Sequence, residues 1–229
     1  MAKYCTKCGK KLDGKSCDCE NNKNTISTTS NFDMNYLISV IKGMFTKPVD
    51  TLQEFIKNDN LSYGLVFIVI NAIILGLFSC LGMKELISFR NANIPALYFQ
   101  SSIDFPYAEV FFRTLLIVII AYVLLAGLFY IVIDKLFKFN SSYKKMITLF
   151  GATSIISSIT LLGTIILMYV SAPLMLILLC CGMIMQNIYM IQGFSFTSDI
   201  DRNQLGYIYT ITYAILLIVS TFILPSILN

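Results

Sequence analysis

Long apolar runs fill the chain from about residue 61 to its end, whereas the first 60 residues contain none. Each run holds about 20 mostly apolar residues, the length that an α-helix needs to cross a hydrocarbon core of roughly 30 Å. The pattern predicts five transmembrane helices with a tight turn around Ser171, at Leu61–Met83, Val110–Ile133, Met146–Val170, Pro173–Gly193 and Leu205–Leu228. The predicted fold class is therefore an all-α polytopic membrane protein with a small N-terminal head.

Two shorter apolar patterns with helical spacing precede the first predicted span. Pro48 suits the first turn of a new helix, so we expect two amphipathic helices that break at Thr46–Pro48. Their apolar faces would lie in the cytoplasmic membrane interface, or they would form a collar packed against the inner loops of the protein. The residues on the two faces are Leu37, Ile38, Ile41, Met44 and Phe45, followed by Val49, Leu52, Phe55 and Ile56.

The composition changes along the chain in a way that predicts four segments. Residues 1–20 form a cysteine-rich head, and residues 21–35, rich in Asn, Ser and Thr, are typical of a flexible linker. Residues 36–60 hold the amphipathic helices, and residues 61–229 form the transmembrane domain. Only 13% of the residues are charged, where a soluble domain has about 25%.

Lysine is distributed unevenly between the predicted loops. Nine lysines precede residue 60 and four lie in Asp134–Lys145, whereas the turn near Ser171 and the C-terminal "PSILN" carry no charged side chain. Because Lys and Arg are enriched on the cytoplasmic side of membrane spans, we expect a cytosolic N-terminus and an external C-terminus. The net charge of +4 is too weak and too dispersed to indicate nucleic-acid binding.

The predicted cytosolic head holds four of the seven cysteines, Cys5, Cys8, Cys17 and Cys19. Thiols persist in the reducing cytosol, so closely spaced cysteines there are better explained as metal ligands than as disulfides. Four thiolates make a closed, structural zinc site, and the Asp13-Gly14 pair would turn the chain between its two halves. The second pair is C-x-C, where a regular zinc ribbon has C-x-x-C, so a degenerate head without metal is the alternative.

Few residues of the chain indicate catalysis. Histidine is absent, which excludes Ser-His-Asp and Cys-His catalysis and histidine-containing metal sites. No nucleophile elbow, Walker sequence or dinucleotide glycine pattern occurs. No charge lies at the centre of a predicted span, and Glu109 and Arg113 near the outer end of the second span are expected to pair with each other. We therefore expect a protein that is not an enzyme.

Polar and small residues inside the spans are the remaining candidates. Asn71, Gln186 and Asn187 would line a polar path or form hydrogen bonds between helices, and the second interpretation is the simpler one. A stripe of Gly151, Ser154 and Ser158 predicts close approach of another span or of a second copy of the chain. Near the inner end of the fifth span, three tyrosines are expected to act as interfacial anchors, Tyr207, Tyr209 and Tyr213.

The layout resembles the Yip (Ypt-interacting protein) domain family of five-pass membrane proteins, over roughly residues 42–228. The resemblance rests on "FTKPVDTLQEFIKND", on "KFNSSYKKMITLFGATSIIS" and on "QNIYMIQGFSFTSDIDRNQLGYIYT". It implies a cytosolic N-terminus and, for the bacterial members of the family, an N-terminal zinc ribbon and a plasma-membrane location. The trafficking role of the eukaryotic members is not carried over, because their inter-helix motifs are not recognisable here.

Two functions remain. The first is a membrane scaffold that contacts lipid and binds a protein partner through its zinc-stabilised head, or assembles with its own copies. The second is a small transporter or permease subunit that uses polar groups of the first and fourth spans. Transport requires Asn71, Gln186 and Asn187 to face one hydrated cavity, whereas a scaffold requires them to be hydrogen-bonded inside a dry bundle.

Overall fold

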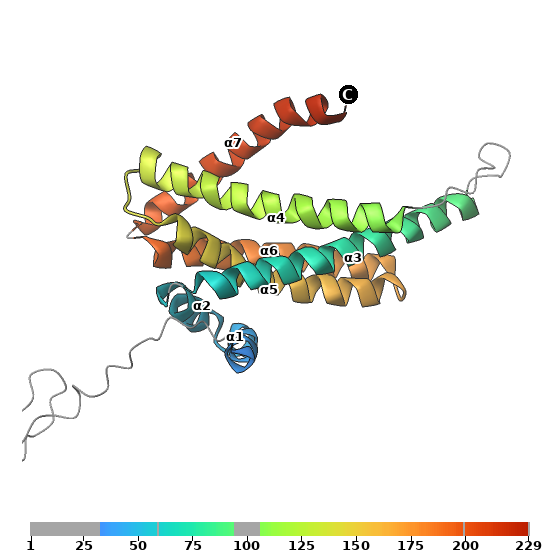
Figure 1. Ribbon diagram of the computed structural model, residues 1–229, viewed down its shortest axis with the longest axis horizontal. Coiled ribbons are helices and arrows are strands. Elements are labelled where there is room, and N and C mark those ends of the chain that lie inside the picture. The colour runs from blue at the N-terminus through green and yellow to red at the C-terminus, as the bar shows by residue number, and fades with distance from the viewer. Residues whose placement is uncertain (1–32, 59, 94–105, 199, 229) are drawn as a thin grey trace, which may run out of the picture. The chain divides into compact units, whose positions relative to one another are not determined.

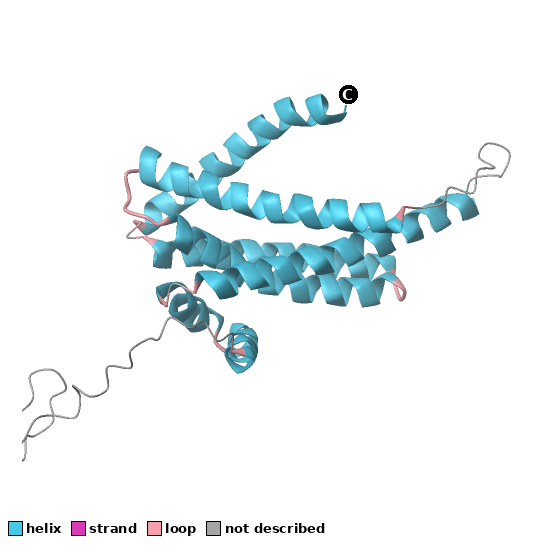
Figure 2. Ribbon diagram, in the orientation of Figure 1, coloured by secondary structure: helices cyan, strands magenta, loops and turns pink. Residues whose placement is uncertain are grey.

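The computed structural model describes residues 33–58, 60–93, 106–198 and 200–228, and all regular structure in this part of the chain is helical (Figure 2). The chain divides into two compact units, Met1–Tyr36 and Leu37–Asn229, and the helix bundle belongs to the second. The predicted cysteine head and nearly all of the predicted linker lie outside the described residues.

Five long helices make up the bundle. Four segments within them are long and apolar enough to cross a membrane: Leu61–Gly82 of α3, Tyr107–Leu136 of α4 and its extension, and the whole of α5 and α6. The apolar part of α7 with described side chains is shorter, so the fifth span stays a prediction. The helices are α3 (Leu61–Asn93), α4 (Tyr107–Ile131) with the π-helical η2 (Val132–Leu136), α5 (Tyr143–Met168), α6 (Ala172–Thr197) and α7 (Arg202–Leu228).

The helix ends follow from local chemistry. Ser142 and Ser171 are extended residues directly before α5 and α6, and Pro173 lies in the first turn of α6, where its missing N–H is not needed. The predicted tight turn around Ser171 is thus present. At the end of α4 the hydrogen bonding widens, because Phe137 N–H donates to the Val132 carbonyl at 3.1 Å. Lys138 then takes a left-handed conformation, with φ 58°, and ends the helical path.

Helix α5 lies at the centre of the unit. It contacts α3, α6, α4 and the short helix α2, and Figure 1 shows α3, α5 and α6 running side by side. Helix α4 also packs on α3, while α7 contacts α6, α4 and η2. Fourteen of the 26 residues of α5 are buried, against five of the 26 residues of α6. The exposed apolar side chains of α4 and α6 therefore face the lipid.

Two short helices precede the bundle, α1 (Met34–Thr46) and α2 (Pro48–Lys57), separated by Lys47 within the predicted break. Helix α2 packs against the helices α5 and α6, whereas the collar interpretation expected contact with the inner loops. Three of the four residues predicted for its apolar face are enclosed: Leu52, Phe55 and Ile56 are at most 1% exposed, and the centroid of the Phe55 ring lies 5.9 Å from that of Phe67 in α3. The fourth, Val49, is 39% exposed.

The apolar face of α1 is only partly enclosed. Leu37 and Met44 of the predicted face are buried, together with Val40, which the sequence reading did not place there. Ile38 and Phe45, which the same reading assigned to that face, are exposed. The apolar face is therefore wider than the surface that the protein offers to it.

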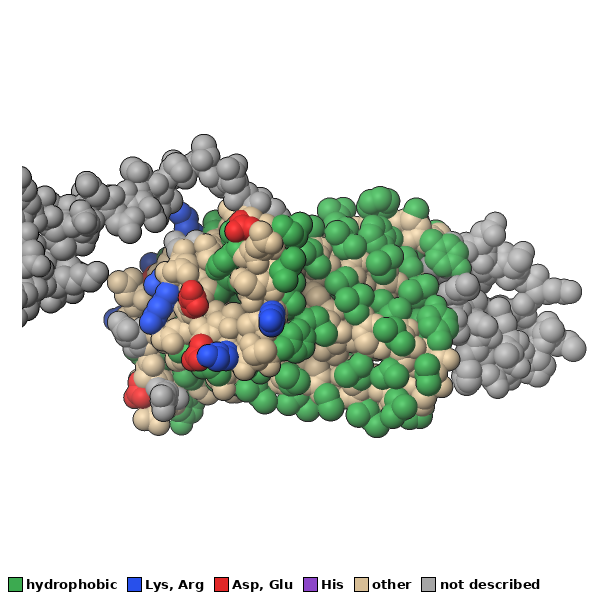
Figure 3. Space-filling model, turned by 90° about the horizontal axis from the view of Figure 1, so that it is seen from below, with side chains coloured by type: hydrophobic (Ala, Val, Ile, Leu, Met, Phe, Trp, Pro, Cys, Tyr) green, Lys and Arg blue, Asp and Glu red, His purple; other side chains and the backbone are tan. Residues whose placement is uncertain are grey.

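Charged side chains gather at one end of the bundle. At this end lie the starts of α3, α5 and α7 and the ends of η2 and α6, because neighbouring helices run antiparallel (Figure 1). In Figure 3 the charged side chains cluster over this end, and hydrophobic side chains cover most of the remaining described surface. The lysines of α1, α2 and the residue between them, and of the stretch from η2 to the start of α5, are Lys42, Lys47, Lys57, Lys135, Lys138, Lys144 and Lys145.

Candidate functional site in the helix bundle

The small-residue stripe of α5 lies against α3. A β-carbon built on Gly151 would fall 2.5 Å from the Cα atom and 2.6 Å from the carbonyl carbon of Gly64. The obstacle is backbone, which cannot rotate out of the way as a side chain can. Gly151 and Gly64 thus let the two helices touch main chain to main chain, the arrangement that small residues permit between membrane helices.

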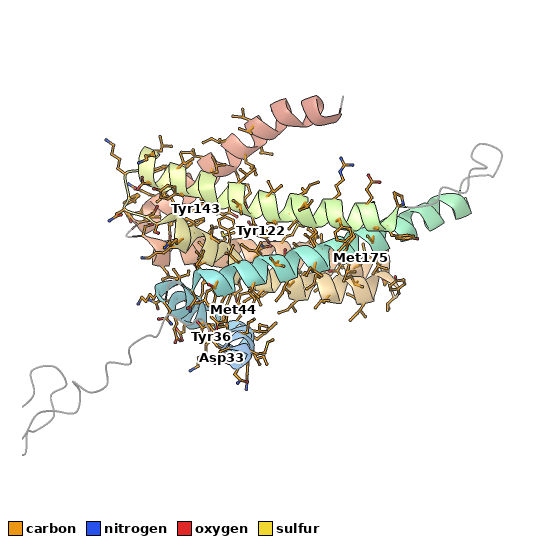
Figure 4. All side chains as sticks on the ribbon, viewed as in Figure 1. Asp33, Tyr36, Met44, Tyr122, Tyr143 and Met175 are labelled. Atoms are coloured by element: carbon orange, nitrogen blue, oxygen red, sulfur yellow. The ribbon has the colours of Figure 1, made fainter. Side chains whose placement is uncertain are left out.

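The rest of the stripe meets Asn71 of α3, which is only 1% exposed. The Asn71 amide donates to Ser158 Oγ at 3.0 Å and to the Ser154 carbonyl at 3.3 Å. Its oxygen accepts from the Tyr122 hydroxyl of α4 at 3.2 Å. Figure 4 shows Tyr122 pointing into the bundle. One asparagine side chain therefore links α3, α4 and α5, and the structure brings Asn71 together with Ser154 and Ser158.

The buried hydroxyls of α5 are satisfied mainly by their own helix. Thr148, Ser154, Ser158 and Thr164 each donate to a carbonyl three or four residues earlier, at 2.6–3.0 Å. This back-bonding removes polar groups from the helix surface. Among the described residues, the only buried side-chain oxygens or nitrogens without a hydrogen-bond partner are the hydroxyls of Ser141 and Ser198, which lie in connections.

The two polar residues of α6 point to different neighbours. Gln186 is half-buried and lies next to the Tyr122 hydroxyl, so it adjoins the Asn71 network. Asn187 is exposed, donates to the Met183 carbonyl of its own helix at 2.7 Å and accepts from the Tyr209 hydroxyl of α7. The three predicted polar residues therefore do not gather around one point: Asn71 and Gln186 share Tyr122, and Asn187 serves the contact with α7.

An aromatic cluster that the sequence reading missed joins α4 to α7. Phe129 is 0% exposed. Its ring centroid lies 4.6 Å from Phe194, 5.7 Å from Phe150, 5.8 Å from Tyr209 and 6.1 Å from Tyr213. We call these five residues the aromatic cluster. Tilted and edge-on ring pairs at such distances are favourable beyond the area they bury. The helices α4, α5, α6 and α7 each contribute at least one ring, so the cluster joins these four helices at one height along the bundle.

The cluster corrects the interpretation of the tyrosines in α7. Tyr209 and Tyr213 are half-buried, and both rings belong to the cluster, with their centroids 4.7 Å apart. Only Tyr207, at 68% exposed, has the exposure of an interfacial anchor. Tyrosines spaced by four residues share one helix face, so sequence alone does not tell whether that face meets a headgroup layer or another helix.

The expected pairing of Glu109 with Arg113 is wrong. Both side chains are exposed, and in the described part of the chain the ion pair within 4.0 Å joins Lys135 and Asp134, at 2.9 Å. An exposed ion pair gains little over separate solvation, so spacing on a helix does not enforce it. Both charges lie in the first two turns of α4, away from the middle of the bundle.

Metal-binding geometry is not visible in the described residues. These contain no group of three or more Cys, Asp or Glu side chains that would hold an ion. Cys80, Cys180 and Cys181 are free thiols within α3 and α6. The predicted zinc ligands Cys5, Cys8, Cys17 and Cys19 lie outside the described residues.

The comparisons with known proteins place the bundle in a family. The Yip1 domain matches residues 42–224, which include the end of α1, all of α2 to α6 and most of α7. The chain belongs to the Yip1 domain family. No curated protein and no solved structure matches the chain. With its apolar helices, this Yip1 domain is an integral membrane protein.

The contacts described above join the helices of the Yip1 domain to one another. Its central residues are small side chains at a backbone contact, amides and hydroxyls bonded to one another, and packed aromatic rings. What the arrangement can do is hold five helices in one fixed packing.

Proposed function

We propose that this Yip1-domain protein is a non-enzymatic membrane scaffold whose cytosolic head binds a protein partner. The bundle supplies a rigid body in the bilayer, and the lysine-rich end faces the cytosol. In this proposal the protein resides in a bacterial plasma membrane with its N-terminus inside and its C-terminus outside. Assembly with further copies of the chain is compatible with the proposal and is not required by it.

The observation that carries the proposal is the state of Asn71. A residue that conducts solute has to exchange its hydrogen bonds with a passing ion or water. Asn71 is 1% exposed and uses its amide and its oxygen on Ser158, Ser154 and Tyr122. Of the three polar residues that a scaffold requires to be hydrogen-bonded inside a dry bundle, Asn71 meets this condition, whereas Gln186 is half-buried and Asn187 is exposed.

Replacing Asn71 by leucine tests the proposal. Because Ser158 still bonds its own helix and Tyr122 adjoins Gln186, we expect a loss of only about 0.6 kcal/mol, typical of hydrogen bonds between membrane helices. The variant and the wild type should both retain K⁺ and calcein inside proteoliposomes as well as empty vesicles do. Thermal unfolding and dye release measure the two expectations.

Asn187→Leu is the matched comparison, because it removes the same amide from a position that faces α7. A solute flux in the wild type that falls in Asn71→Leu or Asn187→Leu would overturn the scaffold proposal in favour of a transporter. Equal vesicle permeability for all three proteins supports the scaffold.

The proposed head rests on the spacing of Cys5, Cys8, Cys17 and Cys19 together with the lysine-rich end of the bundle. Residues 37–60 and the loops at this end carry most of the lysines of the described part, as cytoplasmic flanks do. A head attached there meets reducing conditions, in which thiolates are available to zinc. Zinc would close the head around four sulfur atoms and give it a fixed surface for a partner.

Purified protein is expected to contain about one zinc ion per chain, and Cys8→Ser is expected to lose it, because a structural site needs all four ligands. Metal analysis of the full chain in detergent measures this. Cys180→Ala is the control, since Cys180 is an exposed residue of α6 and should leave the zinc content unchanged. Cross-linked partner adducts formed in native membranes should disappear with Cys8→Ser and persist with Cys180→Ala.

Zinc-free protein from a zinc-replete preparation, with all four head thiols open to alkylation, would refute the metal site. Adducts that survive Cys8→Ser would refute partner binding by the head. Neither result would affect the proposal for the bundle, which rests on Asn71.

A further inference from the structure

Helix α1 has an apolar face more than twice as wide as the sector of it that the protein encloses. At 3.6 residues per turn, the buried Leu37, Val40 and Met44 span roughly 60° of the helix. Ile41, Phe45 and Ile38 extend the apolar sector by about another 100°. Ile38 is 58% exposed and Phe45 is 65% exposed, whereas Ile41 is half-buried, so the outer part of this sector has little cover within the described part of the protein.

The position of α1 along the chain keeps it at the membrane surface. Helix α2 ends at Lys57 and the first candidate span begins at Leu61, so the connection is too short to carry α2 far from the bilayer. A single residue, Lys47, separates α1 from α2. The two helices also touch, because a β-carbon built on Gly43 would fall 2.5 Å from Thr51 Oγ1 and 2.9 Å from its Cγ2.

The charge around the uncovered sector is positive. Lys42 is exposed and lies about 40° beyond Ile38 on the helix, at the edge of the apolar face. Lys47 follows at the end of α1 and is also exposed. Among the described acidic residues of this region, Asp33 directly precedes α1 and accepts from the Asn35 N–H, while Asp50 and Glu54 are exposed on α2. An apolar face bordered by lysine is the pattern of helices that lie in the headgroup layer of anionic membranes.

We propose that α1 is an interfacial lipid anchor: Ile38, Ile41 and Phe45 enter the boundary between headgroups and acyl chains of the leaflet at the lysine-rich end, and Lys42 contacts anionic headgroups. The structure thereby divides the two interpretations of the amphipathic segment between its helices. Helix α2 packs on the bundle, and α1, which touches α2 at Gly43 and Thr51, is the membrane contact. This inference is independent of the scaffold proposal, because it rests on α1 alone and holds equally for a scaffold and for a transporter.

The chain contains no tryptophan, so one introduced indole reports on one position. Phe45→Trp replaces one aromatic side chain by another that favours the membrane interface. In proteoliposomes of phosphatidylcholine and phosphatidylglycerol, this indole should be quenched by lipids brominated near the top of the acyl chain and protected from aqueous iodide. Ser39→Trp, on the opposite polar face of α1, should show the reverse. Ile38→Trp repeats the test at a second position, with helix content checked by circular dichroism.

Quenching of the Phe45→Trp and Ile38→Trp indoles by iodide, as for Ser39→Trp, would show that water covers the face and would overturn the inference. Protection from both quenchers would show that protein covers it, a partner or a second copy of the chain, and would overturn the inference as well. The supporting result is quenching from the lipid alone, lost in part when phosphatidylglycerol is omitted or when Lys42→Glu is added.

Discussion

Gly151→Leu is expected to force α3 away from α5 and to cause the larger of two major losses of stability. The β-carbon alone would meet the Gly64 backbone at 2.5–2.6 Å, so neither helix can absorb the new side chain by a rotamer change. Overpacking a tight interface costs about 1–3 kcal/mol, and a backbone obstacle places the variant at the upper end. We expect the midpoint of thermal unfolding in detergent to fall by several degrees, with a broader or shifted size-exclusion peak.

Gly206→Leu is the control for this variant. A β-carbon built on Gly206 meets nothing within 4 Å, so the same substitution should leave the unfolding midpoint nearly unchanged. Gly151→Leu should also be far more harmful than Asn71→Leu, because a hydrogen bond between membrane helices is worth less than the close approach that permits it. If Gly151→Leu unfolds at the wild-type temperature, the contact between Gly151 and Gly64 does not hold the bundle together.

Phe129→Ala is expected to loosen α7 from the rest of the bundle. The substitution removes the ring that contacts α5, α6 and α7 at once and leaves a cavity among Phe150, Phe194, Tyr209 and Tyr213. In water-soluble cores this change costs about 3–5 kcal/mol. The transfer part of that cost is smaller in lipid, so we expect roughly 2–3 kcal/mol, mostly from lost packing. Thermal unfolding and protease cleavage between α6 and α7 measure the change.

Phe112→Ala is the matched control, because Phe112 lies on the same helix and is 61% exposed. It should change neither the unfolding midpoint nor the rate of cleavage. Equal effects of the two substitutions would mean that Phe129 contributes no more to stability than an exposed, lipid-facing phenylalanine. The aromatic cluster would then not attach α7 to the bundle.

Most ends of the long helices could be predicted from the sequence to within about four residues, but α3 continues to Asn93, ten residues beyond its predicted end at Met83. The apolar runs begin and end at strong local signals, such as the extended Ser171 followed by Pro173 before α6. The break between α1 and α2 at Pro48 could also be predicted from the sequence. These features depend on neighbours in the chain, and local chemistry decides them.

The sequence predicted only one side of each contact between helices. Gly151, Ser154 and Ser158 announced a close approach, but their partners, Gly64 and Asn71, lie more than eighty residues earlier in the chain. Apolar spans also carry little amphipathic signal, because lipid and protein interior are both apolar, so the buried face of a membrane helix is hard to see. For that reason Phe129 went unnoticed among the other apolar residues of α4.

The central burial of α5 has a consequence for biosynthesis. This helix has the lowest mean hydropathy of the four candidate spans. Because it also carries buried serines and threonines, its insertion into lipid as an isolated helix is the least favourable of the four. Its principal neighbour, α3, precedes it in the chain and has left the ribosome when α5 emerges. The backbone contact at Gly64 and the side chain of Asn71 are thus already in the bilayer when α5 arrives, so translation order supplies a docking face before the least apolar span needs one.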